Sequence, residues 1–452
     1  MMPMTVTEFA RRCGGDSIGF EADAVLSGFA LDHREVSSGD MFIAIRGARF
    51  DGHDVAEAAI SAGAVGALVE RRIAGPHVLV QNVVDALAQL GRSVRAEFAG
   101  PVVGVTGSNG KTATKEFVAA CLGAKGKVLK SAGNRNTEFT SPLLWSELDP
   151  AVWAVVVEMA MRGPGQIAHL TSIAQPTIAI VTMVGTAHAE MVGSREGIAR
   201  AKAEILQEGA AAVLWSEDDF YAFLKDQATG PVHTFGFSPE SELRVLGYRP
   251  LSWNRCVVRY QWEGRTAEAE LATVGRHQAL NAGAAVLASV LAGVDFDSAA
   301  EQLFKAQLPP MRMESISVHG ATVLLDNYNA SPDSTVAAIR TLAELPCEGK
   351  RFAVIGEMRE LGEFSETGHR QVGRALAEAP FDGIMLYGNE TRFVHSEAIR
   401  AGYPEFRLTE AANLHDIAAF LNQLQPKDVA LIKGSRALEL EKALEELEVA
   451  SK

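Results

Sequence analysis

A glycine-rich loop at residues 104–115 constrains the fold of this chain more than any other feature. It reads Gly-Val-Thr-Gly-Ser-Asn-Gly-Lys-Thr-Ala-Thr-Lys, follows the apolar residues 101–103, and leads into a helical pattern that ends near Leu122. A strand, a glycine-rich turn and a helix in this order bind nucleotide phosphates, because backbone N–H groups and the helix N-terminus face the anion. The sequence therefore predicts an α/β domain with a mononucleotide-binding phosphate loop.

Two residues of this loop carry most of its expected chemistry. Lys111 is expected to reach the β- and γ-phosphates, and the hydroxyl of Thr112 to bind Mg²⁺ between them. The general pattern has glycine five residues before Gly110, where this chain has Val105, and a Gly-Lys-Thr tripeptide also occurs by chance. The residues expected to contact the nucleotide are Gly107, Ser108, Asn109, Gly110, Lys111, Thr112 and Thr114.

Composition narrows the class of protein. A chain of 452 residues exceeds the size of one hydrophobic core, so several domains are expected. A net charge of −14, with no dense Lys/Arg cluster, argues against a nucleic-acid-binding protein. The four cysteines have no paired spacing, which favours reduced thiols over disulfides or zinc. With no leader-like N-terminus and no apolar run of about eighteen residues, we expect a cytoplasmic protein without membrane insertion.

The pattern along the chain predicts three α/β domains. Gly100-Pro101 interrupts the chain after the first domain, and Pro309-Pro310 is interpreted as a hinge before the third. In the second domain, apolar runs alternate with helical patterns, which indicates parallel strands joined by crossover helices. The change to polar and apolar alternation at residues 232–274 predicts appended antiparallel strands. The predicted domains are residues 1–98, residues 99–308 and a Rossmann-like domain at residues 309–452.

Two polar residues of the central domain come directly after predicted strands. Glu158 ends the apolar run 154–157, and His188 follows the run 177–182 through a short loop. Open α/β sheets bind ligands at the carboxyl ends of their strands, so both residues are candidates for the site. Taken singly, a strand-end glutamate is more often a surface residue, and a loop histidine more often structural.

Lys202 lies within an apolar stripe at helical spacing. Ile198 precedes it by four residues, and Ala201, Ile205 and Leu206 belong to the same stripe. Burial would lower the pKa of the lysine, and a neutral amine can react with carbon dioxide to form a carbamate, an anionic metal ligand. From spacing alone, the more common alternative is a lysine whose stem covers the core while its ammonium group reaches water.

Together, the central motifs resemble the Mur ligase family of cell-wall biosynthesis, and the resemblance covers nearly the whole chain. The resemblance implies that Val105 is normal for this loop and that ATP is the nucleotide. It also implies two Mg²⁺ ions, with Thr112 and Glu158 on one, and His188 and a carbamylated Lys202 near the other. Lys111, Glu158, His188 and Lys202 would be catalytic. The matching segments are residues 104–112, 133–137, 158–159, 185–190 and 201–204.

Three C-terminal segments most resemble the branch of this family that adds D-alanyl-D-alanine to UDP-N-acetylmuramoyl-tripeptide. They are residues 326–334, 356–363 and 433–436. By similarity, His277 and Asn281 would lie near the adenine, and Arg312 and Asp326 would contact the ribose and phosphates. The residues implied to contact the substrates are Asn134, Asn136, Thr137, Tyr328, Asn329, Lys433, Ser435 and Arg436. Without the resemblance, Tyr328-Asn329 is equally an ordinary strand-end turn, and residues 433–436 a helix-initiating loop.

The segments 32–34, 38–42 and 47–53 look like the UDP-sugar domain of the family. The resemblance implies substrate contacts by His33, Arg34, Ala48 and Arg49. His33 stands where the family usually has a serine that tends to touch the UDP group. The other departures from the family pattern are Met183 for asparagine, Leu325 for aspartate and Ser331 for asparagine.

The reaction implied is ATP-dependent amide formation through an acyl phosphate. UDP-N-acetylmuramoyl-tripeptide and D-alanyl-D-alanine would be the substrates of a cytoplasmic monomer that serves peptidoglycan synthesis, and thereby cell shape and division. Two alternatives stay open. One is another ligase of the superfamily, such as folylpolyglutamate synthase, and the other is a nucleotide-dependent binding or switch protein.

Overall fold

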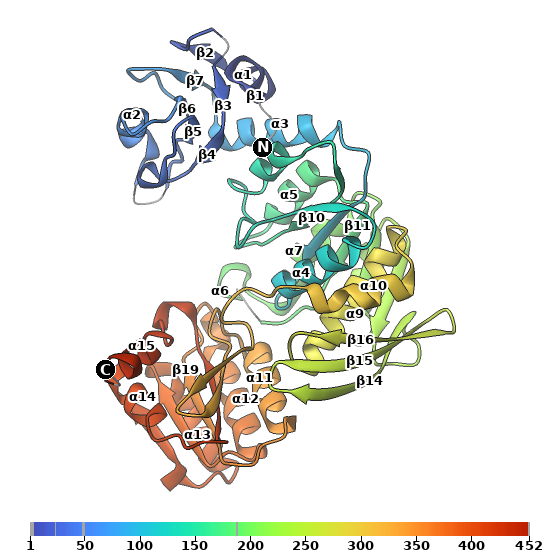
Figure 1. Cartoon of the computed structure of the whole chain (residues 1–452), viewed down its shortest axis with the longest axis vertical. Coiled ribbons are helices and arrows are strands. Elements are labelled where there is room, and N and C mark those ends of the chain that lie inside the picture. Colours follow the sequence, from blue (N-terminus) through green and yellow to red (C-terminus); the bar gives the residue numbers. More distant parts are fainter. Residues whose placement is uncertain (1–3, 23, 48–49, 187–188, 451–452) are drawn as a thin grey trace. The chain divides into compact units, whose positions relative to one another are not determined.

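The computed structural model describes residues 4–22, 24–47, 50–186 and 189–450 (Figure 1). Within these ranges, three main sheets of five, nine and six strands follow one another along the chain, and β1 (Met4–Thr5) pairs with β3 (Val25–Leu26). The predicted α/β fold with three sheet domains is confirmed. Close packing divides the chain into two units. The first comprises Met1–Gly104, Gly126–Met161 and Gly165–Ile178, and the second Val105–Lys125, Arg162–Pro164 and Ala179–Lys452.

The N-terminal sheet has the strand order β2-β7-β6-β5-β4. Strands β4 to β7 are parallel, and β2 is antiparallel to β7. Helix α3 begins after Asn82, whose side chain accepts a hydrogen bond from the backbone N–H of Asp85 at 3.0 Å, a capping arrangement that satisfies a free helix donor. The elements are α1 (Val6–Cys13), β2 (Asp16–Ile18), β4 (Gly28–Ala30), β5 (Asp40–Ile43), α2 (Ala56–Ser61), β6 (Gly66–Val69), β7 (His77–Leu79) and α3 (Val83–Arg95), with short 3₁₀ turns at His33–Glu35 and Gly52–Val55.

The central sheet has the strand order β16-β15-β14-β13-β12-β11-β8-β10-β9. Its strands are β8 (Val102–Thr106), β9 (Lys127–Lys130), β10 (Val152–Glu158), β11 (Ile178–Val181), β12 (Ala211–Trp215), β13 (Val232–Gly236), β14 (Leu243–Ser252), β15 (Arg255–Trp262) and β16 (Arg265–Leu271). Its helices are α4 (Lys111–Leu122), α5 (Gln166–Ala174), α6 (Ala189–Val192), α7 (Arg195–Ala203), α8 (Tyr221–Gln227), α9 (Arg276–Leu291) and α10 (Phe296–Gln302).

The start of the antiparallel part of this sheet differs from the prediction. Strand β13 was expected to be antiparallel, but it pairs in parallel with both β12 and β14. Helix α8 connects β12 to β13 and brings the chain back to the start of the sheet, so that the two strands run parallel. The residue pattern of β13 alone does not reveal this connection. The antiparallel pairing begins with β14 and β15 and continues with β16.

The C-terminal sheet has the strand order β17-β18-β22-β19-β20-β21. Only β17 is antiparallel, so the other five strands present their carboxyl ends at one edge. Two apolar clusters pack on this sheet, one built with α11 to α13 and the other with α14 and α15. The elements are β17 (Glu314–Val318), β18 (Ala321–Leu325), α11 (Pro332–Glu344), β19 (Arg351–Gly356), α12 (Ser365–Glu378), β20 (Gly383–Tyr387), α13 (Arg392–Arg400), β21 (Leu408–Ala411), α14 (Leu414–Leu421), β22 (Val429–Lys433) and α15 (Lys442–Ala450).

In the part of the chain that the structure describes, no helix is both long enough and apolar enough to cross a membrane.

Candidate functional site

The glycine-rich loop lies between β8 and α4, as predicted, and two of its glycines have positive φ angles. Gly107 has φ 145°, and a Cβ there would lie 1.9 Å from Oγ1 of Thr182. Gly110 has φ 83°, and a Cβ there would lie 2.5 Å from Oδ1 of Asn281. Both positions therefore require glycine, for conformation and for space. Val105 is fully buried within β8, where the strand needs a side chain rather than a turn.

Hydrogen bonds to the end of β11 fix this loop. The N–H of Ser108 donates to the carbonyl of Met183 at 2.9 Å, and the hydroxyl of Thr182 donates to the carbonyl of Asn109 at 2.5 Å. The ammonium group of Lys111 donates to the carbonyl oxygens of Gly107 and Ser108, at 2.7 and 3.3 Å. The lysine is thus held over the loop it belongs to, where a phosphate oxygen can replace a carbonyl as its partner.

Lys202 on α7 is almost completely buried, with 1% of its surface exposed. Its Nζ has no hydrogen-bond partner among the residues that the structure describes. Burial, together with the nearby cation of Lys111, lowers the pKa of Lys202 well below its usual range, whereas Glu204 acts in the opposite direction. A lysine that covers the core and reaches water does not fit this burial. The structure supports a neutral amine inside the protein.

The C-terminal domain contributes an arginine to the phosphate loop. Nη2 of Arg312 donates to the Thr112 hydroxyl at 3.1 Å, and the guanidinium lies 4.4 Å from the ring centre of Tyr328. The aromatic ring orients the arginine by a cation–π contact. Two residues that were predicted separately, the expected Mg²⁺ ligand and the expected ribose and phosphate contact, are therefore brought together.

The buried Lys433 forms an ion pair with the partly exposed Asp326 at the ends of β22 and β18. Nζ of Lys433 lies 2.7 Å from Oδ2 of Asp326, and it also donates to the carbonyl oxygens of Asp326 and Asn329 at 2.9 and 3.0 Å. Only 2% of the Lys433 side chain is exposed. The N–H of Met313 donates to the other Asp326 oxygen at 3.1 Å. Lys433 thus holds the turn that contains Asp326 and Asn329 in place, and its ammonium charge is neutralised by the Asp326 carboxylate.

The predicted adenine contacts lie at the start of α9. Burial lowers the pKa of His277 to about 4, with Asp326 raising it and Lys433 lowering it by smaller amounts. The amide of Asn281 donates to Oε1 of Gln278 at 3.2 Å, and its oxygen faces Gly110. Both residues belong to the same unit as residues 105–115 of the phosphate loop. Because its pKa is lowered to about 4, His277 is neutral near pH 7.

Two further contacts to the central domain were not predicted. The hydroxyl of Ser331, which also caps α11, donates to Oδ1 of Asn109 at 3.0 Å. A carboxylate oxygen of Asp333 accepts a hydrogen bond from the N–H of Thr186 at 3.2 Å. Ser331 stands where the family pattern has asparagine, and its place before Pro332 is the signal that could have identified its hydroxyl as a helix cap.

Glu158 belongs to the first unit, which contains Gly126–Met161. It ends β10 and is buried, with 2% of its surface exposed. Its Oε1 accepts a hydrogen bond from the amide of Asn136 at 2.8 Å, and its N–H donates to the hydroxyl of Ser131 at 3.1 Å. Thr137 contacts the hydroxyl of Thr140 at 3.1 Å, and Asn134 is exposed. A surface position for Glu158 is therefore excluded, and Asn136 orients its carboxylate.

His33 and Arg34 lie in the turn after β4. Arg34 donates to both oxygens of Asp32, at 2.9 and 2.5 Å, and His33 is partly exposed beside them. Ala48, Arg49 and His188 lie outside the described residues. His53, from the quoted motif, is buried, with Nδ1 2.6 Å from Asp51 and Nε2 accepting from the N–H of Glu70 at 2.9 Å.

Among the residues that the structure describes, no group of three His, Cys, Asp or Glu side chains is arranged to hold a metal ion. The hydroxyl of Thr112 and, in the other unit, the carboxylate of Glu158 each offer oxygen atoms of the kind that Mg²⁺ prefers. The donor chemistry therefore fits magnesium.

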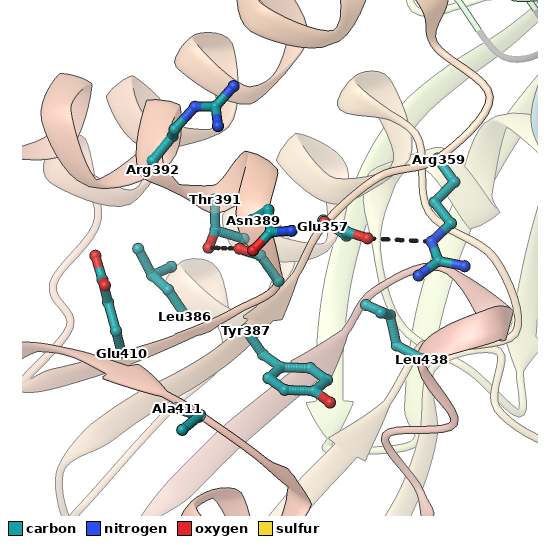
Figure 2. A pocket seen from close by; sticks show the side chains of 12 residues that line it. Glu357, Arg359, Leu386, Tyr387, Asn389, Thr391, Arg392, Glu410, Ala411 and Leu438 are labelled. Carbon is teal, nitrogen blue, oxygen red and sulfur yellow. Dashed lines mark hydrogen bonds and ion pairs between the residues drawn. The ribbon is translucent and has the colours of Figure 1, made fainter.

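A pocket of about 470 Å³ opens at the carboxyl ends of β19, β20 and β21 (Figure 2). Figure 2 shows Glu357, Asn389 and Thr391 near its middle, Arg359 on one side and Arg392 with Glu410 on the other. Glu357 and Arg359 belong to the motif at residues 356–363, and the sequence analysis predicts no role for either side chain. A polar residue directly after a strand, such as Glu357 after β19, was the signal that could have located this pocket.

Ser435 of the C-terminal motif contacts two residues that line this pocket. The hydroxyl of Ser435 accepts a hydrogen bond from the N–H of Arg359 at 2.8 Å, and the N–H of Ser435 donates to the carbonyl of Glu357 at 3.2 Å. Arg436 forms an ion pair with Glu441.

A phosphate loop on a largely parallel sheet is contacted by an arginine from a second, largely parallel domain. This combination defines a multidomain α/β protein that uses a nucleotide.

Comparison with known proteins identifies the family within this class of nucleotide-using proteins. Three family descriptions match: "Mur ligase family, catalytic domain" at residues 26–95, "Mur ligase middle domain" at 105–289 and "Mur ligase, glutamate ligase domain" at 311–436. A UDP-N-acetylmuramoyl-tripeptide–D-alanyl-D-alanine ligase from Bacillus subtilis (strain 168) is 31% identical, and the match covers 94% of this chain and 93% of the relative.

Solved structures agree with the sequence match. A crystal structure of MurF from Acinetobacter baumannii has a TM-score of 0.89 and 29% identity, with 99% of both chains covered. MurF from Thermotoga maritima in complex with ADP has a TM-score of 0.80 and 32% identity, covering 93% of this chain and 96% of that one. The chain belongs to the Mur ligase family. It is an ATP-dependent ligase that forms carbon–nitrogen bonds.

Proposed function

We propose that this chain joins D-alanyl-D-alanine to UDP-N-acetylmuramoyl-tripeptide in the synthesis of peptidoglycan precursors. The observation that carries the proposal is the match, over nearly the whole chain, to ligases of that name. The site adds support, because the phosphate loop and the arginine that contacts it are suited to phosphoryl transfer from ATP. The expected place of this work is the cytoplasm, and the expected state is a monomer.

In the first step, the terminal carboxylate of the tripeptide attacks the γ-phosphorus of ATP. An O–P bond forms, the bond to the β,γ-bridging oxygen breaks, and an acyl phosphate and ADP result. Two anions must approach each other, so catalysis depends on positioned positive charge. Lys111 supplies one such charge at the loop, and Arg312 supplies a second beside Thr112.

Magnesium would neutralise further phosphate charge in this step. The proposed ligands are Thr112 and Glu158 for one ion, and a carbamylated Lys202 with His188 for the other. The support within the structure is the buried carboxylate of Glu158 and the buried amine of Lys202, which has no hydrogen-bond partner among the described residues. Carbamylation would turn that amine into an anion without requiring a buried ammonium.

In the second step, the amine of the dipeptide attacks the activated carbonyl carbon. A tetrahedral intermediate forms, phosphate leaves, and the amine loses a proton as the amide is made. We propose that residues 1–98 bind the UDP-sugar, residues 99–308 bind ATP and residues 309–452 bring the dipeptide. The proposed contacts of the UDP-sugar include His33 and Arg34, and Asn134, Asn136 and Thr137 are proposed to face the acyl substrate.

A coupled phosphate-release assay tests this function. Turnover should require ATP, UDP-N-acetylmuramoyl-tripeptide and D-alanyl-D-alanine together, and it should be run with tripeptides ending in lysine and in diaminopimelate. Slow ATP hydrolysis that no acceptor stimulates would indicate a switch protein. Turnover with a folate and glutamate, but not with the muramoyl substrate, would indicate a folylpolyglutamate synthase.

A further inference from the structure

We infer that Met311 and Glu314 are positioning residues, which hold the turn at residues 311–313 in the conformation that lets Arg312 reach the bound nucleotide. This rests on the part of the proposed function in which Arg312 supplies positive charge at the phosphate loop. The arginine lies two residues after Pro310, at the hinge predicted from the sequence. A side chain that acts from a hinge needs local contacts to give it one direction.

The residues on both sides of Arg312 have left-handed backbones. Met311 has φ 59° and Met313 has φ 55°. Such angles are uncommon for residues other than glycine, and they cost free energy because the Cβ atom crowds the backbone. A conformation of this kind persists only where the surrounding structure determines it. The contacts of the turn, and not the preference of methionine, therefore set its shape.

Hydrogen bonds to the backbone hold this turn within the C-terminal domain. The N–H of Met311 donates to Oε2 of Glu314 at 2.9 Å, and the carbonyl of Met311 accepts from the N–H of Tyr328 at 3.2 Å. The N–H of Met313 donates to Oδ1 of Asp326 at 3.1 Å. The side chain of Met313 is buried in one of the two apolar clusters on the C-terminal sheet. The main chain is thus anchored on both sides of the arginine.

The side chain of Arg312 leaves this turn in a fixed direction and retains a donor for a ligand. Its guanidinium lies 4.4 Å from the ring centre of Tyr328, and its Nη2 donates to the Thr112 hydroxyl at 3.1 Å. Its Nε is buried and has no hydrogen-bond partner among the residues that the structure describes. A phosphate oxygen can supply that partner. Because the turn and the ring already fix the guanidinium, binding costs little side-chain entropy.

Calorimetric titration of the full chain with Mg²⁺ and a non-hydrolysable ATP analogue tests the role of Met311. Met311→Pro fixes φ at about −65° and removes the N–H that Glu314 accepts, so the Kd should rise about tenfold. Met311→Gly, which adopts positive φ readily, should bind within about twofold of the parent chain. Arg312→Ala should also raise the Kd about tenfold. Adding Met311→Pro to Arg312→Ala should cause no further rise, because both substitutions remove the same contact.

A pair of substitutions at Glu314 gives a second measurement, which decides the matter if Met311→Pro does not fold. Glu314→Ala should raise the Kd about threefold, because the N–H of Met311 loses its acceptor. Glu314→Gln keeps an acceptor oxygen and should bind as the parent chain does. Both variants remove the same charge, so the difference between them reports the hydrogen bond. Glu301→Ala, which removes an exposed carboxylate from α10, is the control and should leave the Kd unchanged.

Three results would overturn the inference. They are a parent-like Kd for Met311→Pro, equal Kd values for Glu314→Ala and Glu314→Gln, and full additivity of Met311→Pro with Arg312→Ala. Additivity would show that the turn affects binding by a route other than the arginine. The titration contains neither the muramoyl substrate nor the dipeptide, so these results leave the proposed ligation intact. Failure of the parent chain to use those two substrates would overturn the proposed ligation alone.

Discussion

Two buried lysines, in helix α7 and in strand β22, have opposite surroundings. Lys202 and Lys433 are nearly equally buried, at 1% and 2% exposure. Lys433 contacts a carboxylate and two carbonyl oxygens, whereas Nζ of Lys202 has no hydrogen-bond partner in the described part of the chain. Burial alone therefore does not determine what a lysine does.

The difference lies in what replaces water around each amine. An ammonium group can be buried when oxygen atoms replace its hydration, as they do around Lys433. Without such atoms the neutral form is favoured, which is why the pKa of Lys202 is lowered by burial and by the neighbouring Lys111. One lysine is suited to holding a turn in place, and the other to chemistry. The following experiments test this division, from the largest expected effect to the smallest.

Replacement of Lys202 should abolish activity without unfolding the protein. Lys202→Ala is expected to lower kcat about a thousandfold, because it would remove the proposed ligand of a magnesium ion whose charge stabilises the transition state. Bicarbonate should not restore it. Phosphate release measures the loss, and the free energy of unfolding of Lys202→Met should fall by less than about 1 kcal/mol, because no paired charge is broken. A variant that keeps most of its kcat would show that Lys202 is merely a buried core residue.

Replacement of Lys433 should act on stability instead. Lys433→Met is expected to lower the free energy of unfolding by about 3 kcal/mol, because Asp326 loses its buried partner. Urea unfolding measures the change. The exposed Lys427→Met is the matched control, since its ion pair with Glu348 is solvent-exposed and should contribute little. If both substitutions lowered the free energy of unfolding equally, the buried ion contacts of Lys433 would contribute no more to stability than an exposed ion pair.

The pH dependence of stability should reveal the partly buried His277. Its folded pKa of about 4 lies below the unfolded value of about 6.5. Between these values the unfolded chain binds more protons, so the histidine's contribution is present above about pH 6.5 and is lost as the pH falls toward 4.

Urea unfolding at several pH values measures this effect. His277→Gln should reduce the fall in free energy across that window by an amount on the order of 2 kcal/mol. The exposed His415→Gln should leave the pH profile unchanged. A His277 variant with the parent profile would show that this side chain is hydrated and titrates normally.

Loss of Arg312 should give the smallest effect, on nucleotide binding. Arg312→Ala is expected to raise the KM for ATP about tenfold, because one charge-assisted contact at Thr112 is lost. Arg340→Ala, on the exposed side of α11, is the matched control. If both variants have the parent KM, the contact between Arg312 and the phosphate loop has no role in nucleotide binding.

Local features of the sequence predicted a large part of this arrangement. The loop at residues 104–115, its strand and its helix are contiguous, so spacing alone located Lys111 and Thr112. The parallel pairing of β13 was missed because alternation of residues does not define strand direction. The pocket was missed for a related reason: Glu357 follows β19, Asn389 follows β20 and Glu410 lies in β21, and only the sheet brings them together.

The sequence by itself determined the family, the phosphate loop and the candidate lysines, because these depend on residue type and on spacing along the chain. It could not distinguish Lys202 from Lys433, or show that Arg312 reaches Thr112. Those results depend on which oxygen atoms surround a side chain after folding, and these come from distant segments. Only the tertiary structure decided which buried amine was paired and which has no hydrogen-bond partner in the described part of the chain, because desolvation and hydrogen bonding are properties of the packed environment.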